Sequence, residues 1–294
     1  VVIDDLLQRP GVLSAIDDAT RNGKLTRSAA MTRARRYANE IAADYSTITL
    51  RILDKVLGGI VFKRVFRAIE TQGLSRVRDW AQDHEIIYMP CHRSHADYLL
   101  VSYTLYHAGL VPPHIAAGVN LNFWPAGAIL RRAGAFYMRR SFSGDRIYSS
   151  VFRAYVDALI RRGYPIEFFP EGGRSRTGKL RPPKYGLLSY LVSAIQSGGA
   201  DDMLLVPVST TYDQMHEVGV MAAEEAGARD VGVGRRVGDE GVGVRQQFQP
   251  LADLVLVHQS QGPDTRGVGL GEPVLFRGRL AAHLVGRRGV ALIV

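Results

Sequence analysis

The chain has 294 residues, enough for one large α/β domain or two smaller domains with a sizeable core. Hydrophobic residues make up 46% and charged residues 22%, as in an ordinary globular protein, and the lack of a run of about 18 apolar residues argues against a transmembrane helix. The formal net charge of +9 indicates anionic partners such as phosphates, nucleic acid or an anionic lipid surface, and the single cysteine excludes an internal disulfide.

Residues 1–80 are predicted to form an N-terminal helical region. Good helix formers run from Thr32 to Ala43, and apolar residues from Ile48 to Leu57 recur at helical spacing until Gly58-Gly59 interrupts them. The helical pattern then resumes from Val61 to Ile69.

From Glu85 onward the pattern changes to strands that alternate with helices, which is typical of βαβ units. We therefore predict an α/β domain over residues 81–218, with a mostly parallel or mixed central sheet flanked by helices. The expected elements are a strand at 86–89, a helix at 97–108, a turn region ending in 134–140, a helix that begins at Ser143-Gly144-Asp145 and ends at Arg162, a strand at 165–169, a helix at 185–196 and a strand at 204–208.

The two ends of the chain differ from this central part. Residues 219–294 are rich in Gly and Arg and poor in hydrophobic periodicity, so we predict a weakly structured or incomplete C-terminal segment. The chain opens with Val1-Val2-Ile3 rather than methionine, and we expect it to be an internal piece of a longer protein or a processed product.

The first candidate site lies where the strand at 86–89 gives way to a helix, a place where ligands usually bind in open α/β sheets. His92 and Asp97 are five positions apart. On a regular helix such a step turns through about 500°, so the two side chains meet only if His92 lies in the turn and Asp97 in the first helical turn. Asp97 would then accept from one ring nitrogen and leave the other free to take a proton. A histidine that is merely hydrogen-bonded in a turn is the simpler interpretation of this pair alone.

Two other interpretations of this stretch stay open. His92 and His95 could ligate a metal, although no Cys or Glu set with familiar ligand spacing lies nearby. Cys91 could be a nucleophile, although its base would have to come from elsewhere because adjacent residues rarely face each other.

A second candidate site is the loop Glu171–Lys179, which contains one carboxylate, three glycines and three cations. Glycines let the backbone approach a ligand closely, and Arg174, Arg176 and Lys179 can grip a phosphate. The order of glycines and the missing Gly-Lys-Ser/Thr ending show that it is not a Walker loop. A solvated basic turn is the alternative, and Arg139-Arg140 alone would be interpreted as surface.

Together these stretches resemble the glycerolipid acyltransferases, and within that family the glycerol-3-phosphate branch. The first motif of the family, a His and an Asp separated by four residues, is matched by His92–Asp97. The next motifs are matched, in the family's order, by Gly134–Arg140, Phe169–Lys179 and Val206-Pro207-Val208. The stretch from Val111 to Gly127 is similar to the glycerol-3-phosphate branch rather than the lysophosphatidate branch.

The resemblance implies transfer of a fatty acyl group from acyl-CoA or acyl carrier protein to the 1-hydroxyl of glycerol 3-phosphate, which gives lysophosphatidate. His92 would be the general base, Asp97 would orient it, and neither a metal nor a cofactor would be required besides the acyl thioester. Backbone N–H groups near Ser94 or Gly172 would stabilise the oxyanion. The residues implied in substrate binding, with Arg140 as the main phosphate ligand, are Arg139, Arg140, Glu171, Gly172, Arg174, Ser175, Lys179 and Pro207.

The resemblance and the positive charge also imply peripheral attachment to the anionic, cytoplasmic face of the cell membrane. No basic stripe interleaved with aromatic residues is present, which argues against nucleic acid as a partner. The alternatives among enzymes are acylation of dihydroxyacetone phosphate or of a lysophospholipid. The alternative from another class is a non-catalytic basic module that binds phosphate, nucleic acid or an anionic membrane.

Overall fold

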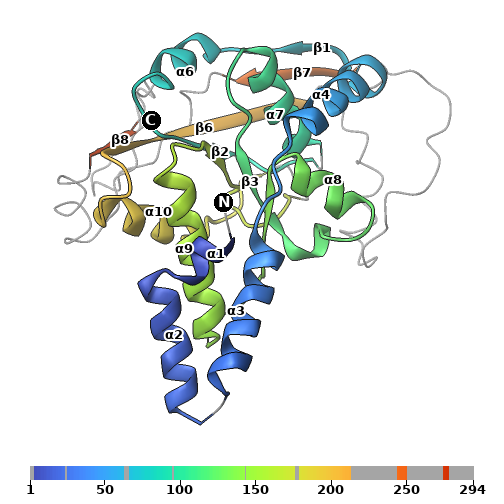
Figure 1. Cartoon of the computed structure of the whole chain (residues 1–294). Helices are drawn as coiled ribbons and strands as arrows, with labels where there is room; N and C mark the ends of the chain where they lie inside the picture. Colours follow the sequence, from blue (N-terminus) through green and yellow to red (C-terminus); the bar gives the residue numbers. More distant parts are fainter. Residues whose placement is uncertain are drawn as a thin grey trace.

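The computed structural model describes residues 3–23, 25–62, 66–94, 96–142, 144–175, 179–212, 244–249 and 274–277, and it places a sheet among helices (Figure 1). The helical elements are α1 (Ile3–Leu7), α2 (Pro10–Arg21), α3 (Arg27–Ile41), α4 (Thr47–Val56), the π-helical η1 (Leu57–Phe62), α6 (Leu74–Trp80), α7 (Asp97–His107), the 3₁₀ turn η2 (Val119–Leu121), α8 (Ala126–Arg132), α9 (Arg146–Ile160) and α10 (Gly186–Gln196). The strands are β1 (Phe66–Glu70), β2 (Ile86–Pro90), β3 (His114–Gly118), β4 (Ala135–Met138), β5 (Ile166–Glu167), β6 (Asp202–Tyr212), β7 (Val244–Gln249) and β8 (Val274–Arg277).

The strands form one sheet in the order β1-β7-β6-β2-β5-β3-β4, and β8 also pairs with β6. The five strands from β6 to β4 in this order run parallel to their neighbours, whereas β7 and β8 pair with β6 in the antiparallel direction. The predicted fold class, α/β with a mostly parallel or mixed sheet, is therefore confirmed. Because parallel strands direct their carboxyl ends to the same edge, the loops after β2, β3, β4 and β5 lie along one edge of the sheet.

Helices cover both faces of the sheet. Successive side chains of a strand point to opposite faces, so a single strand contributes to the cores on both sides. Ile87 and Met89 of β2 pack in the larger core with helices α1, α2, α3, α9 and α10. Ile86 and Tyr88 of the same strand pack in a second core with helices α6 and α7. The loop after β2 therefore begins from a strand that is fixed on both sides.

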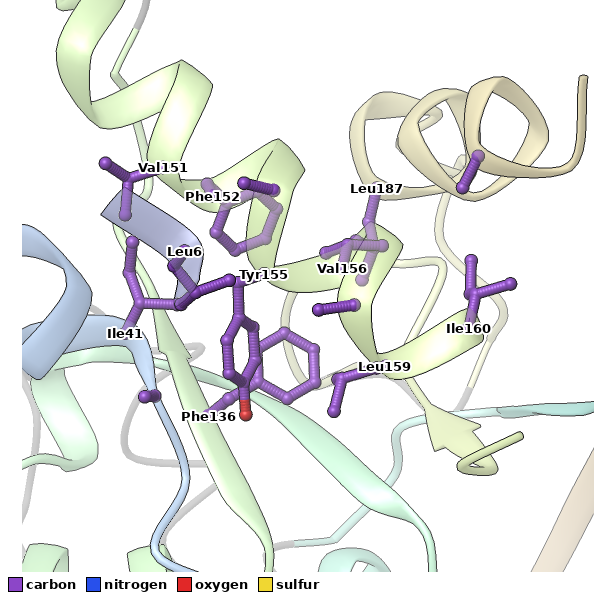
Figure 2. Close-up of a cluster of buried hydrophobic side chains, with 14 of the residues drawn as sticks. Leu6, Ile41, Phe136, Val151, Phe152, Tyr155, Val156, Leu159, Ile160 and Leu187 are labelled. Atoms are coloured by element: carbon purple, nitrogen blue, oxygen red, sulfur yellow. The ribbon is translucent and has the colours of Figure 1, made fainter. Parts of the chain in front are cut away.

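Helix α9 lies at the centre of the larger core. Asp145 caps its N-terminus as predicted, since the carboxylate accepts from the Tyr148 N–H at 3.0 Å. Figure 2 shows apolar side chains of α9 beside Phe136 of β4, Ile41 and Leu187. Burial of one such side chain stabilises the fold by roughly 1.5–3 kcal/mol. Helices α1, α2 and α3 contribute several of these side chains, so they are part of the same core as the sheet.

Most elements predicted for the α/β domain are confirmed to within a few residues. Helix α7 ends at His107, and Gly109 follows with a left-handed φ of 76°, as its role as a helix stop requires. Helix α10 begins one residue after the predicted start, and strand β6 is longer than the predicted strand at 204–208. Strand β5 is shorter than the predicted strand at 165–169.

The structure differs from the sequence prediction in two places. The turn region predicted to end in 134–140 contains strand β4, and β3 and α8 precede it. Residues 66–70, predicted to continue a helix, form β1, which pairs with β7. Periodicity does not distinguish a strand from a helix in short apolar runs, which is the reason for both differences.

The prediction for residues 219–294 lies mostly outside the described residues, of which only β7 and β8 belong to this part. The division of the chain at residues 80 and 218 stays a prediction. Among the helices that the structure describes, none combines the length and the apolar character needed to cross a bilayer.

Candidate active site

His92 and Asp97 meet in the connection between β2 and α7. His92 lies just after β2, and Asp97 is the first residue of α7. The ring Nδ1 lies 3.2 Å from Asp97 Oδ2, and both side chains are buried, so the geometry predicted for the pair is confirmed. With Nδ1 facing the carboxylate, the neutral ring keeps its proton on Nδ1 and presents Nε2 as an acceptor.

Three further donors orient the Asp97 carboxylate. The N–H groups of Arg93 and Ser94 donate to Oδ2 at 2.7 and 2.8 Å, and the hydroxyl of Thr210 donates to Oδ1 at 3.1 Å. Arg93 and Ser94 belong to the same turn as His92, whereas Thr210 lies on β6. Sequence reasoning missed Thr210, because no motif marks a single threonine in a strand.

The other ring nitrogen of His92 faces Tyr98, the second residue of α7. The Tyr98 hydroxyl lies 3.1 Å from Nε2, and the two rings meet edge to face with centroids 4.8 Å apart. Phe169 lies against both rings, with centroids 4.4 Å from His92 and 4.6 Å from Tyr98. The imidazole is thus fixed by a carboxylate on one side and by two aromatic rings on the other. Tyr98 directly follows the His92–Asp97 motif in the sequence, but no role for it was predicted.

Glu171 and Ser175 join the loop after β5 to the loop after β2. Glu171 is buried, and its two carboxylate oxygens accept from the N–H groups of His92 and Arg181, each at 2.9 Å. The Ser175 N–H donates to the His92 carbonyl at 2.7 Å, and its hydroxyl donates to the Lys179 carbonyl at 2.6 Å. Both residues therefore hold the basic loop beside His92. Their predicted contacts with substrate stay predictions.

The two arginines after β4 have different surroundings. Arg139 makes a bidentate ion pair with Glu40 of α3, at 2.6 and 2.7 Å, and lies over the rings of Tyr37 and Tyr148. Arg140 is exposed. Because β4 lies three strands from β2 and neighbouring strands are about 4.8 Å apart, roughly 14 Å separate the two strands. An extended Arg140 side chain and a ligand the length of glycerol 3-phosphate together span such a distance.

Two basic residues that sequence reasoning did not select fold back over the glycine pair of the loop. A Cβ atom on Gly172 would lie 2.7 Å from Lys184 Cδ, and one on Gly173 would lie 2.9 Å from Arg181 Nη1. Arg181 Nη1 also lies 3.4 Å from the Arg174 carbonyl. Because the two glycines have no side chain, Lys184 and Arg181 can lie against the loop, which brings two more cations to it. Only their spatial placement identifies Arg181 and Lys184, since both follow the motif in the sequence.

Pro207 and Lys179 lie at the margins of this arrangement. Pro207 is buried in β6 opposite Met89 of β2, between the part of β6 that pairs with β8 and the part that pairs with β7. A residue without an N–H fits this gap in the pairing. Lys179 is exposed. The substrate-binding roles of both residues, like those of Arg139 and Arg174, stay predictions.

Comparison with known proteins agrees with this geometry. Residues 68–211 match the family model described as Acyltransferase. A glycerol-3-phosphate acyltransferase of Actinobacillus succinogenes is 50% identical over 228 residues, which are 77% of this chain and 28% of that protein. Over residues 68–211 the chain belongs to the acyltransferase family. It spans 28% of the length of this relative.

A solved structure is also similar to this chain. It is the 1-acyl-sn-glycerophosphate (LPA) acyltransferase PlsC from Thermotoga maritima, with a TM-score of 0.45 and 17% sequence identity. The likeness covers 82% of this chain and 81% of that one.

The chain contains an apolar cavity that reaches Tyr98, the neighbour of His92. It encloses about 230 Å³ between α4, α7, β3, β4 and α8, and Tyr98 is part of its wall. Leu53 of α4 and Leu130 of α8 line the cavity, whereas Ile48 and Ile52 of α4 are 69% and 57% exposed. Helix α4 thus has one apolar side toward the cavity and another toward the surface. The helical spacing predicted for this segment is confirmed, but part of its apolar stripe is exposed.

A second carboxyl group, Glu167 of β5, lies fully buried beneath the site. Its two neighbours in the sheet are Tyr88 and Ile115, and neither carboxyl oxygen has a hydrogen-bond partner among the described residues. Burial, and then the nearby charge of Asp97, raise the pKa of Glu167 well above its ordinary value. Burial therefore favours the neutral form of this carboxyl group. Sequence reasoning missed it.

The structure bears on the other interpretations of the motif. The Cys91 thiol is buried against Thr210, with Sγ 3.7 Å from Oγ1 and 3.4 Å from the backbone nitrogen, and this contact does not supply the base that a nucleophile needs. Within the described part of the chain, no group of three or more His, Cys, Asp or Glu side chains could hold a metal ion, and His95 lies outside that part.

Both backbone groups expected to bind the oxyanion are already engaged. The Ser94 N–H donates to Asp97, and the Gly172 N–H donates to the Phe169 carbonyl at 3.0 Å. Each of these two N–H groups is used to shape its own turn. Binding of the oxyanion by backbone N–H groups near Ser94 or Gly172 stays a prediction.

Proposed function

We propose that the chain carries the catalytic domain of a glycerol-3-phosphate 1-O-acyltransferase. The domain would move a fatty acyl group from the thioester of acyl-CoA or acyl carrier protein to the 1-hydroxyl of glycerol 3-phosphate and form lysophosphatidate. The observation that carries the proposal is the buried His92, which Asp97 orients, which contacts the basic loop through Ser175 and whose Nε2 faces Tyr98 in the wall of an apolar cavity. The similarity to the acyltransferase of Actinobacillus succinogenes supports the choice of acceptor.

His92 acts as the general base in this proposal. An alcohol is a weak nucleophile until its proton is removed, and Nε2 is the ring nitrogen that can take it. Asp97 holds the ring in the required tautomer and stabilises the imidazolium that forms. The imidazolium then gives its proton to the departing thiolate. The acceptor hydroxyl attacks the thioester directly, so no acyl-enzyme intermediate is needed.

The phosphate of the acceptor binds to the basic groups at the same edge of the sheet. Arg140 is the principal candidate, because its side chain is exposed while the guanidinium of Arg139 is paired with Glu40. Arg181 and Lys184 join Arg174 and Lys179 as candidates, since they lie over the glycine pair of the loop. Planar guanidinium groups suit phosphate because they can donate two parallel hydrogen bonds.

The acyl chain of the donor occupies the apolar cavity. Its wall is mostly aliphatic and aromatic, and it reaches Tyr98 beside His92, so a chain in the cavity brings its thioester to the base. Only the thioester and the acceptor take part in the chemistry, and this proposal includes no metal or cofactor.

The chain attaches peripherally to the anionic cytoplasmic face of the membrane in this proposal. The exposed residues Ile48, Ile52 and Trp124 can enter the interface, and Arg51 and Lys55 on α4 can pair with anionic headgroups. Because α4 also lines the cavity, an acyl donor could pass from the bilayer surface to the site along this helix.

The decisive experiment measures free thiol released from palmitoyl-CoA, with and without glycerol 3-phosphate, and identifies the product by mass spectrometry. We expect thiol release that depends on glycerol 3-phosphate and a product with the mass of palmitoyl lysophosphatidate. Parallel reactions with palmitoyl acyl carrier protein as donor, and with dihydroxyacetone phosphate or lysophosphatidate as acceptor, test the finer assignment. Release that does not depend on any acceptor would contradict acyl transfer.

A further inference from the structure

Acyl transfer places negative charge on the carbonyl oxygen of the thioester, and an enzyme that catalyses it needs a donor at that position. The N–H groups nearest the base do not supply it. His92 donates its own N–H to Glu171, and Arg93 and Ser94 donate theirs to Asp97. Since each of these groups supports the turn that carries His92, turning one of them toward a substrate would disturb the base itself.

The hydroxyl of Tyr98 lies where such a donor is required. It is 3.1 Å from Nε2 of His92, and the ring of Tyr98 forms part of the cavity wall. The acceptor oxygen must approach Nε2 within hydrogen-bonding distance to lose its proton. The carbonyl carbon that it attacks is then one bond farther away, so the carbonyl oxygen lies a few ångströms from Nε2, in the neighbourhood of the phenol.

The surroundings of Tyr98 keep the phenol protonated and its ring in place. Burial raises the pKa of Tyr98, and the carboxyl groups of Glu167 and Asp97 raise it further, so the hydroxyl remains a donor throughout the physiological pH range. Phe169 packs against the ring with centroids 4.6 Å apart. The hydroxyl hydrogen can rotate about the C–O bond while the ring stays fixed.

We propose that Tyr98 is a further catalytic residue, whose hydroxyl donates to the thioester carbonyl oxygen when the acyl chain occupies the cavity. The inference rests on the proposed function, because it requires a thioester donor. In the structure the hydroxyl lies 3.1 Å from Nε2 and donates to it when the ring proton is on Nδ1. A hydroxyl has one hydrogen to donate, so turning it to the carbonyl oxygen also frees Nε2 for the acceptor.

Acyl transfer then proceeds through one tetrahedral intermediate. The acceptor O–H proton moves to Nε2 while the new C–O bond forms, and the carbonyl oxygen becomes an oxyanion that accepts from the Tyr98 O–H. Collapse of this intermediate restores the carbonyl group and breaks the C–S bond. The proton on Nε2 then passes to the sulfur. Tyr98 keeps its proton throughout.

The test combines turnover with the binding of two inert donor analogues to the full chain. Tyr98→Phe removes the hydroxyl and keeps the ring, and Tyr190→Phe on α10 removes a phenol hydroxyl from a ring that packs on Phe142 and Phe152. We expect Tyr98→Phe to lower kcat by about 100-fold with little change in the KM for glycerol 3-phosphate, as for loss of one oxyanion donor. Tyr190→Phe should match the parent.

The analogues identify the atom with which the hydroxyl interacts. S-hexadecyl-CoA is a thioether without a carbonyl group, and S-(2-oxoalkyl)-CoA has a ketone one methylene from sulfur. Tyr98→Phe should weaken binding of the ketone by roughly 3- to 10-fold, the effect of one hydrogen bond, and leave the thioether unchanged. Equal loss for both analogues, no loss for either, or an unchanged kcat would overturn the proposal.

Failure of the proposed function would look different. A parent chain that binds the analogues but releases no thiol in the presence of glycerol 3-phosphate contradicts the function, while the analogue comparison still decides the contact made by Tyr98. A parent chain that binds neither analogue, whether the analogue is carried on coenzyme A or on acyl carrier protein, overturns both.

Discussion

The Thr210 hydroxyl donates to Asp97 Oδ1 at 3.1 Å and so ties the carboxylate that orients His92 to strand β6. Thr210→Val keeps the shape of the side chain but removes this donor. We expect kcat to fall by about tenfold, because a hydrogen bond to a charged group is worth roughly 1.5–3 kcal/mol and part of this loss is absorbed by the remaining donors. Acyl-transfer assays measure the change.

Thr104→Val is the matched control for Thr210. Thr104 is also buried, on α7, and its hydroxyl has no hydrogen-bond partner among the described residues. The control should keep parental activity. A Thr210→Val protein that is as active as the control would show that the β6 contact does not help to orient Asp97.

His92→Ala and Arg140→Ala should affect different kinetic constants. We expect His92→Ala to abolish turnover, because no other group takes the acceptor proton. Arg140→Ala should mainly raise the KM for glycerol 3-phosphate, by about tenfold or more, since it removes a charge-assisted hydrogen bond to phosphate. Arg161→Ala, which removes an arginine paired with Asp157 on α9, is the control. Parental rates in purified His92→Ala protein would show that the base is wrongly assigned.

Glu167 should make stability fall as the pH rises. The unfolded chain releases this proton near pH 4.5, whereas burial keeps the folded state protonated to higher pH. Between the two pKa values the folded state binds one more proton, so each pH unit lowers the free energy of unfolding by about 1.4 kcal/mol. The side chain in Glu167→Gln is neutral at every pH. The free energy of unfolding of this variant should therefore increase relative to that of the parent as the pH rises above 5. Urea unfolding of both proteins at pH 5 and pH 8 measures the difference in their free energies of unfolding. The same difference at both pH values would contradict a raised pKa of Glu167.

Gly172→Ala separates close packing from backbone strain. Gly172 has a φ of 61°, and a Cβ atom there would lie 2.7 Å from Lys184 Cδ. Gly198, with a φ of 74° and no atom within 4 Å of such a Cβ, is the control. Both alanine variants should lose roughly 1–2 kcal/mol of stability through the left-handed conformation, measured by urea unfolding. Only Gly172→Ala should raise the KM for glycerol 3-phosphate, because only its new Cβ atom displaces Lys184. Equal KM values in the two variants would show that Lys184 does not bind the phosphate.

Ile52→Glu tests the proposed membrane contact of α4. Ile52 is 57% exposed, and its insertion into an interface is worth roughly 1.5–3 kcal/mol, so the variant should bind phosphatidylglycerol vesicles about tenfold more weakly. Ser189→Glu adds the same charge to α10 as a control. Vesicle flotation measures both. Parental flotation of Ile52→Glu would place the membrane contact elsewhere.

The contact between His92 and Asp97 could be predicted because it is local. A buried strand, a turn and a helix start fix the two side chains within five residues, and the spacing leaves one geometry in which they meet. The N-cap at Asp145 was predictable for the same reason, since the side chain binds an N–H three residues away.

Contacts between distant segments could not be predicted in this way. Thr210 lies 113 residues from Asp97, and no periodicity connects them. Tyr98 is close in sequence, but its role depends on the cavity formed by α4 and α8. Strands β3 and β4 were not recognised because their apolar runs are as short as a helical turn. The order of strands in the sheet decides which loops share an edge, and the pattern along the chain does not specify that order.

The ion pair between Arg139 and Glu40 joins helix α3 to the end of β4, across 99 positions of the chain. A protein shortened to begin after α3 would lose the carboxylate that neutralises Arg139, and a second free guanidinium would then lie beside Arg140. Such a truncation would alter the local charge that the acceptor phosphate meets. Anyone who trims this protein for expression should therefore keep Glu40, even though it is far from the reacting atoms in the sequence.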